Sequence, residues 1–206
     1  MFFYNGNTHK TCTFSTADKI CEAALTLFSQ QGFFNTSVHH IQQEAQVSIG
    51  SIYHHFGSKE AIANKLYAKI LDQMNDAFVD IISQHESFQD KYFHITKLLF
   101  EMTETESRTM KFIFHTKYSE YCDLNKSIYQ SKPFQTIYKE VTISCDSEVM
   151  KEQLETIDLI MASLFSLPIQ LIQLHLDGVI KTPITERTAI TNKLVWDGLC
   201  DHKTIK

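Results

Sequence analysis

The segment that decides the fold is residues 47–56, which read Val47-Ser48-Ile49-Gly50-Ser51-Ile52-Tyr53-His54-His55-Phe56. Ser48 is a natural N-cap for a short helix in which Ile52 and Phe56 lie one turn apart on the same face. A turn at Gln46 and Val47 leads into Ser48. Apolar side chains recur at helical spacing from the preceding residues onward: Val38, Ile41, Ala45, Val47, Ile52 and Phe56. The pattern predicts two short helices joined by a tight turn.

The residues before this pair predict a longer first helix. Ser15 followed by Asp18 resembles a capping box, which starts the helix near residues 15–16. Gly32 suits its end, because glycine tolerates the left-handed backbone found after many helices. The hydroxyls of Thr36 and Ser37 are natural N-caps for the helix that follows.

The residues after the pair continue the helical pattern. Ser58 is positioned to cap a long fourth helix that carries Ile62, Leu66, Ile70, Met74 and Ile81 along one face. Further helical segments are predicted near residues 89–105, 108–122, 126–144, 148–177 and 184–200. With only 6 Gly and 3 Pro in 206 residues, the composition also favours an all-α chain.

A helix pair of this kind can place its second helix in the major groove of DNA, where base edges show distinct donor and acceptor patterns. Gly50 lets the backbone approach closely, and a helix N-terminus at Thr36 or Ser37 offers N–H groups to a phosphate. The side chains left exposed once the apolar anchors are buried are Ser48, Ile49, Gly50, Ser51, Tyr53, His54 and His55. Spacing alone leaves open the alternative that the pair is only a packing unit.

One connected string resembles the TetR family of repressors: Gly50-Ser51-Ile52-Tyr53-His54-His55-Phe56-Gly57-Ser58-Lys59-Glu60, preceded by Phe33 to Thr36 and by the Val47-Ser48 turn. The resemblance covers about residues 12–72. It aligns Gln46 with a turn position that is often Gly in the family, so Gln46 must take or avoid a left-handed conformation at some energetic cost. It implies an N-terminal arm over residues 1–11, a DNA-binding domain over 12–72 with its helix-turn-helix at 36–55, and a ligand-binding and dimerisation domain over 73–206. The implied function is a repressor that a small-molecule inducer releases from its operator. The alternative is a nucleoid-associated or cell-division factor of the same fold.

The resemblance also assigns contacts on double-stranded operator DNA. It implies phosphate contacts from Thr36, Ser37, Tyr53, His54 and Lys59, and base or groove contacts from Ile49, Gly50 and Ser51. A homodimer is implied because two recognition helices must lie about one DNA turn apart.

The charge of the chain does not indicate nucleic-acid binding. The net charge is −5, and residues 1–60 carry three lysines against four carboxylates, which gives −1. The same residues hold His9, His39, His40, His54 and His55, which can add positive charge below about pH 6.5. DNA affinity is therefore expected to weaken as the pH rises from about 6 to 8.

The C-terminal part is expected to hold the inducer and the dimer interface. Residues that combine apolar bulk with polar groups are the pocket candidates, with ordinary core as the alternative: Phe100, Met102, Phe112, Phe114, His115, Tyr118, Phe165 and Gln170. The interface candidates lie on the last two long helices: Leu164, Leu171, Ile172, Leu194, Trp196 and Leu199. Pro168 should bend its helix and free a backbone carbonyl.

Other classes of function find little support in the sequence. It has no Gly-rich phosphate loop, G-x-S-x-G elbow or H-E-x-x-H pair, so no enzyme, catalytic residue, metal or cofactor is expected. The five cysteines are odd in number and form no C-x-x-C pair, so reduced thiols are expected. Polar residues interrupt Leu159–Leu176, the most apolar stretch, and a cytoplasmic protein without a membrane span is expected.

Overall fold

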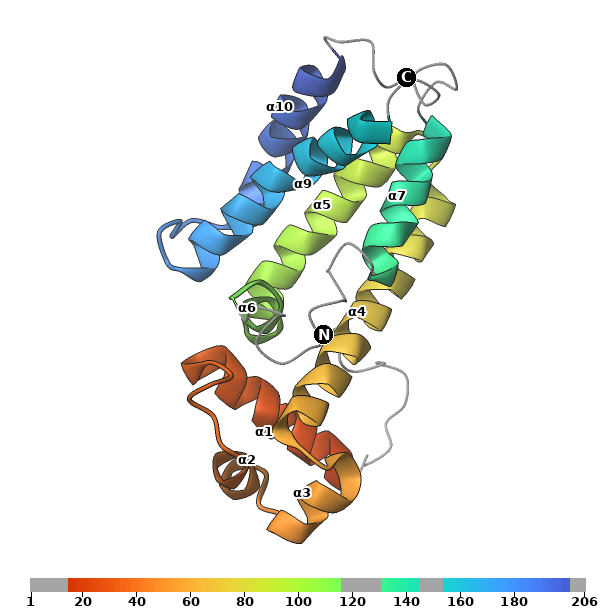
Figure 1. Ribbon diagram of the computed structural model, residues 1–206. Coiled ribbons are helices and arrows are strands. Elements are labelled where there is room, and N and C mark those ends of the chain that lie inside the picture. The colour runs from red at the N-terminus through yellow and green to blue at the C-terminus, as the bar shows by residue number, and fades with distance from the viewer. Residues whose placement is uncertain (1–14, 116–130, 145–153, 201–206) are drawn as a thin grey trace. The chain divides into compact units, whose positions relative to one another are not determined.

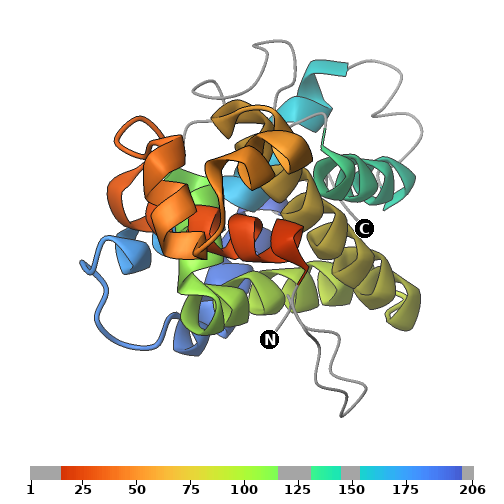
Figure 2. The ribbon, with the colours of Figure 1, turned by 90° about the horizontal axis from the view of Figure 1, so that it is seen from below.

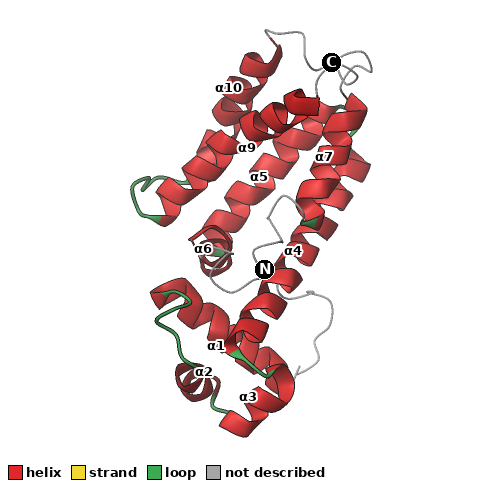
Figure 3. Ribbon diagram, viewed as in Figure 1, coloured by secondary structure: helices red, strands yellow, loops and turns green. Residues whose placement is uncertain are grey.

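The fold of the chain is helical, as predicted. A computed structural model describes residues 15–115, 131–144 and 154–200. Within these ranges every regular element is a helix and no strand occurs (Figure 1, Figure 3).

The helices fall into two compact units, each described here by itself. The first unit contains α1 (Thr16–Gln31), α2 (Val38–Ala45), α3 (Ile49–Phe56), the beginning of α4 (Lys59–Gln84) and α6 (Ser107–His115). The second contains the end of α4, α5 (Phe88–Thr105), α7 (Lys132–Ser144), α9 (Leu154–Leu176), the 3-10 helix η3 (Ile184–Arg187) and α10 (Thr188–Cys200). The division after Gln73 lies next to the predicted boundary, but α6 groups with the N-terminal helices, which the sequence did not indicate.

The first unit packs around α1, which α2, α3 and α6 all contact. α2 and α3 are short helices set at steep angles to α1, and Figure 2 shows the three from below. Ile20, Ala24 and Phe28 bring the apolar stripe of α1 into the core, with Phe28 only 2% exposed. From α6, the Phe112 ring stacks on Phe28 with centroids 5.8 Å apart. The core of this unit therefore includes residues about 85 positions apart in the chain.

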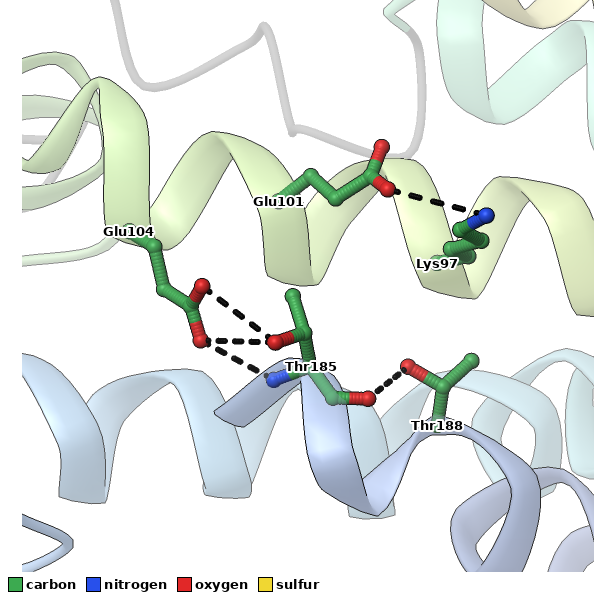
Figure 4. Close-up of polar contacts among 5 residues, drawn as sticks. All are labelled: Lys97, Glu101, Glu104, Thr185 and Thr188. Atoms are coloured by element: carbon green, nitrogen blue, oxygen red, sulfur yellow. Dashed lines mark hydrogen bonds and ion pairs between the residues drawn. The ribbon is translucent and has the colours of Figure 1, made fainter. Parts of the chain in front are cut away.

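The second unit packs α5 against α9 and α10. A carboxylate from α5 caps the start of η3: Glu104 accepts from the Thr185 backbone N–H at 3.0 Å and from the Thr185 hydroxyl at 3.1 Å (Figure 4). Thr188 in turn donates its hydroxyl to the Thr185 carbonyl at 2.7 Å, which ties η3 to α10. A backbone N–H in the first turn of η3 thus finds its hydrogen-bond acceptor on another helix. The local sequence cannot indicate such a partner.

Pro168 lies inside α9, which continues through it from Leu154 to Leu176. Proline has no N–H, so the carbonyl of Leu164, four residues earlier, lacks its helical donor. The Tyr92 hydroxyl of α5 donates to that carbonyl at 2.5 Å, in a buried position. Burial raises the pKa of the Tyr92 phenol, so the group keeps the proton that it donates. The freed carbonyl expected from the sequence therefore joins α5 to α9.

Removing this hydroxyl should destabilise the second unit. Tyr92→Phe leaves the buried Leu164 carbonyl without a donor and should lower the free energy of unfolding by about 1–3 kcal/mol. Chemical denaturation measures the loss. In a Pro168→Ala background the helix regains its own donor, so the same Tyr92→Phe change should have less effect. An equal loss in both backgrounds would contradict this role.

The most apolar part of α9 is only partly covered by the protein. Leu159–Leu176 is long and apolar enough to cross a membrane by length and composition, and 33% of this stretch is buried inside the structure. Leu159 is 68% exposed, whereas Leu164 and Ile172 on other faces are fully buried. One face of α9 thus completes the core and another leaves apolar side chains exposed.

Candidate nucleic-acid interface

The predicted helix pair is present and its ends are capped as the sequence indicates. The Ser37 hydroxyl accepts from the His40 N–H at 3.1 Å, and the Ser48 hydroxyl accepts from the Ser51 N–H at 3.1 Å. Between the helices, Gln46 adopts the left-handed conformation with φ 53° and ψ 46°. Among the described residues it is the one non-glycine with positive φ, so the tight turn is formed despite the cost of that conformation.

Burial separates the anchors of the pair from its outer face. Ile41 and Ile52 are fully buried and Ala45 is 8% exposed, while Val38, Val47 and Phe56 are half-buried. On the outer face Ser48, Gly50, Tyr53, His54 and His55 are exposed, with Ser37, Ile49 and Ser51 partly so. Tyr53 is 53% exposed, so its side chain is accessible to a partner. The residues predicted to face DNA on α3 therefore share one accessible surface.

Two residues predicted to bind phosphate are instead built into the joint before α2. Thr36 is 1% exposed, and its hydroxyl donates to the Gly32 carbonyl at 2.8 Å. The Lys59 ammonium donates to the Phe33 and Thr36 carbonyls, each at 2.8 Å, and lies 4.1 Å from the centre of the Phe33 ring. These contacts join the start of α4 to the segment between α1 and α2. Thr36 and Lys59 therefore hold the helix pair in position.

Lys59 should therefore matter for stability. Lys59→Met keeps the aliphatic stem but removes both charge-assisted hydrogen bonds, and should lower the free energy of unfolding by about 1.5–3 kcal/mol. Lys65→Met is the matched control, because Lys65 is exposed and contacts only the Phe56 ring, at 5.3 Å, among the contacts described for it. Thermal or chemical unfolding distinguishes them, and equal losses would refute the anchoring role.

The surface of the helix pair carries little fixed charge. From Val38 to Phe56 the only residue among Asp, Glu, Lys and Arg is Glu44, while His39, His40, His54 and His55 are all exposed. Positive charge on α2 and α3 must therefore come from helix N-termini and from protonated imidazoles.

The comparison with known proteins agrees with this geometry. Residues 20–66 match the family model described as bacterial regulatory proteins, tetR family. These residues form a DNA-binding domain of the TetR family. The protein is a DNA-binding transcriptional regulator, and the matched residues contain all of α2 and α3.

TetR-family relatives extend the likeness beyond the helix-turn-helix. The chain is 27% identical over 141 residues to the Staphylococcus aureus biofilm operon icaADBC negative transcriptional regulator IcaR, covering 64% of this chain and 74% of the relative. Against IcaR of Staphylococcus epidermidis it is 30% identical over 91 residues, 42% of this chain and 47% of the relative.

Solved structures show the same fold at low sequence identity. A TetR-family regulator from a Shewanella species superimposes with a TM-score of 0.72 at 18% identity, covering 90% of this chain and 98% of the other. FadR of Bacillus subtilis, in complex with stearoyl-CoA, gives a TM-score of 0.63 at 16% identity, covering 86% and 96%.

The pocket candidates do not form one group. Phe100 and Met102 are buried in the second unit. Phe112 is buried in the first unit, where it packs on Phe28 and Tyr67. Phe114 and Phe165 are half-buried and Gln170 is exposed, while the side chain of His115 and all of Tyr118 lie outside the described residues. The ligand site stays a prediction.

The interface candidates also differ in burial. Leu164 and Ile172 are fully buried within the chain, which leaves no surface for a partner. Leu171 and Trp196 are half-buried, and Leu194 is 58% exposed. The side chain of Leu199 is outside the described residues. Helical periodicity identified the apolar helices but not which of their faces the chain itself covers.

The remaining chemistry-bearing residues show no clustered site. Within the described ranges no group of three or more His, Cys, Asp or Glu side chains is placed to hold a metal. Cys21 is a free thiol whose pKa burial raises, although the nearby Lys69 opposes the shift. The side chains of the other four cysteines lie outside the described part of the chain.

Proposed function

We propose that the protein is a repressor that occupies an operator through α2 and α3 and leaves it when a small molecule binds. The observation that carries the proposal is the accessible face of α3, formed on a family-matched helix pair with capped ends. The IcaR relatives are named as negative regulators, which favours repression over activation. A role on DNA supports the expected cytoplasmic location.

The proposed DNA contacts follow the exposed surface. Ser37, Ser48, Ser51 and Tyr53 offer hydroxyls to phosphates, and Ile49 and Gly50 lie at the start of α3, the end that meets base edges in this motif. His54 and His55 complete the surface in the last turn. Thr36 and Lys59 are not among the proposed contacts, because their polar groups bond carbonyls between α1 and α2.

Genome-wide mapping of the bound protein tests the proposal. A repressor should occupy a few promoters, whereas a nucleoid-associated factor of the same fold should occupy many spaced sites. Transcription from the occupied promoters should rise when the gene is deleted. Occupancy of many sites without such a rise would favour the nucleoid alternative.

The inducer is proposed to bind in the second unit. FadR of Bacillus subtilis holds stearoyl-CoA on the same fold, so long-chain acyl-CoA is the first class to screen. An inducer should release the protein from a labelled duplex of its mapped promoter, which a fall in the fluorescence anisotropy of the duplex measures. A ligand that binds without releasing DNA would not be one.

His54 and His55 should contribute to DNA binding. Both side chains are exposed in the last turn of α3, on a surface that carries little fixed charge. A His54→Gln, His55→Gln variant should bind the operator about three- to tenfold more weakly than the wild type at constant low salt. Equal affinity of the two proteins would refute this contribution.

A further inference from the structure

The ring of His40 stands at the centre of a hydrogen-bond network that joins α1 to α2. Its Nδ1 accepts from the Ser37 backbone N–H at 3.2 Å, and the Gln31 side-chain amide lies 3.4 Å from the same nitrogen. The Ser37 hydroxyl reciprocates by accepting from the His40 N–H at 3.1 Å. The Ser37 N–H donates to Nδ1, so this nitrogen carries the lone pair in the contact and a neutral ring would hold its proton on Nε2.

The Gln31 amide extends the network to the rest of the joint. It also lies 3.2 Å from the Asn35 carbonyl and 3.2 Å from the Thr36 hydroxyl, and Asn35 donates back to the Gln31 carbonyl at 2.8 Å. The last residue of α1 is thus tied to the first turn of α2 through side chains. Among the described residues of α2 and α3, His40 is the histidine that caps a helix start.

We propose that His40 is a positioning residue that holds the first turn of α2 against the end of α1 only while its ring is neutral. The inference rests on the proposed function in one respect, that α2 and α3 together bind operator DNA. It assigns to His40 the part that Glu or Gln plays in a capping box.

Protonation of His40 removes the contact for two reasons. A protonated imidazole has a hydrogen on both nitrogens, so Nδ1 can no longer accept the Ser37 N–H. The ring then also carries a positive charge at the N-terminus of α2, where the helix dipole disfavours cations. Protonation of His40 therefore releases the first turn of α2.

The charged groups around His40 do not compensate for this change. From α1, Gln31 is neutral, and the charged residues of that helix lie in its first two turns, away from Gln31. The start of α4 brings the Lys59 ammonium onto the Thr36 carbonyl, next to Ser37. On α2 itself Glu44 is one turn along and His39 is adjacent, while α3 contributes His54 and His55 in its last turn. Lys59 opposes a second cation. Glu44, at the i+4 position from His40, favours a protonated ring only weakly because it is exposed to solvent.

The test compares operator affinity across pH for four full-length proteins: the wild type, His40→Gln, His40→Ala and His39→Gln. The probe is a fluorescent duplex carrying the DNA upstream of the protein's own gene. Gln at position 40 keeps a neutral acceptor at every pH, Ala lacks one at every pH, and His39→Gln is the matched control at an exposed neighbour. Far-UV circular dichroism confirms that each variant is folded at each pH.

The expected result is a pH-dependent difference confined to position 40. His40→Gln should match the wild type at pH 8 and bind about fivefold more tightly than it at pH 5.5, because the wild type loses a helix cap. His40→Ala should be weaker than His40→Gln by about the same factor at both pH values. A His40→Gln to wild-type ratio that stays constant with pH, or that rises equally for His39→Gln, would overturn the proposal.

A second measurement decides the role of His40 without DNA. The backbone amide resonance of Ser37 should shift with the titration of His40 in the wild type and stay constant in His40→Gln. A Ser37 amide that titrates equally in both proteins would overturn the proposal. Failure of all four proteins to bind any duplex would count against the repressor function, while the Ser37 amide would still report on His40.

Discussion

Phe112→Ala should destabilise the DNA-binding unit by about 3–5 kcal/mol, although Phe112 lies far outside the helix-turn-helix in sequence. Its side chain is fully buried, stacked on Phe28 at 5.8 Å and edge-on to Tyr67 at 6.3 Å. Truncation removes both ring contacts and leaves a cavity at the centre of the unit. DNA binding should fall in proportion to the fraction of folded protein.

Phe114→Ala is the matched control for this prediction. Phe114 lies two residues later on α6 and is only half-buried, so its loss should cost about 1 kcal/mol or less. The ion pair from Arg108 to Glu22 at 3.0 Å also joins α6 to α1, but both side chains are about half exposed and contribute little. Chemical denaturation of the full chain measures each change. Equal losses for the two phenylalanines would show that Phe112 is not part of the core.

Charge introduced on the exposed faces of α9 and α10 should separate the proposed dimer and reduce operator affinity by about 10²–10⁴-fold. Leu159, Ile190 and Leu194 are 68%, 53% and 58% exposed. Ala162, Ser163 and Ser166 lie exposed beside Leu159 and let a second helix approach closely. A two-fold dimer through these faces would bury the apolar side chains and couple two DNA-reading units.

The variant to test is Ile190→Glu with Leu194→Glu, followed by light scattering at micromolar concentration and by DNA titration. It should be monomeric and folded. Ile143→Glu is the control, since Ile143 is 67% exposed on α7 and should tolerate charge without a change in oligomeric state. A wild type that is itself monomeric, or a double variant that remains dimeric, would contradict this interface.

The sequence predicted those parts of the site that depend on local chemistry. Ser37 and Ser48 cap the two helices as expected, and Gln46 takes the left-handed conformation that its place in the turn requires. Hydroxyl caps and turn geometry involve neighbouring residues, so single-sequence reasoning can reach them. The histidine cap of α2 was missed, because His at the third position of a helix is not the usual partner of an N-cap serine.

The sequence could not predict roles that arise from distant packing. Lys59 was expected to face phosphate, but its ammonium bonds carbonyls 23 and 26 residues earlier. Phe112 was grouped with pocket residues because aromatic character does not show which core a side chain joins. Leu164 and Ile172 were placed at a dimer interface because periodicity reveals an apolar face but not the neighbour that covers it.

The measurement that tests the central claim most directly is a footprint of the purified full-length protein on a promoter that it occupies in the cell, at low salt and pH 6 to 8. The repressor account predicts two protected half-sites whose centres lie about one helical turn, roughly 34 Å, apart, with protection lost when Tyr53 and Gly50 on α3 are replaced. Absence of protection across that pH range, or protection that survives these α3 substitutions, would contradict it.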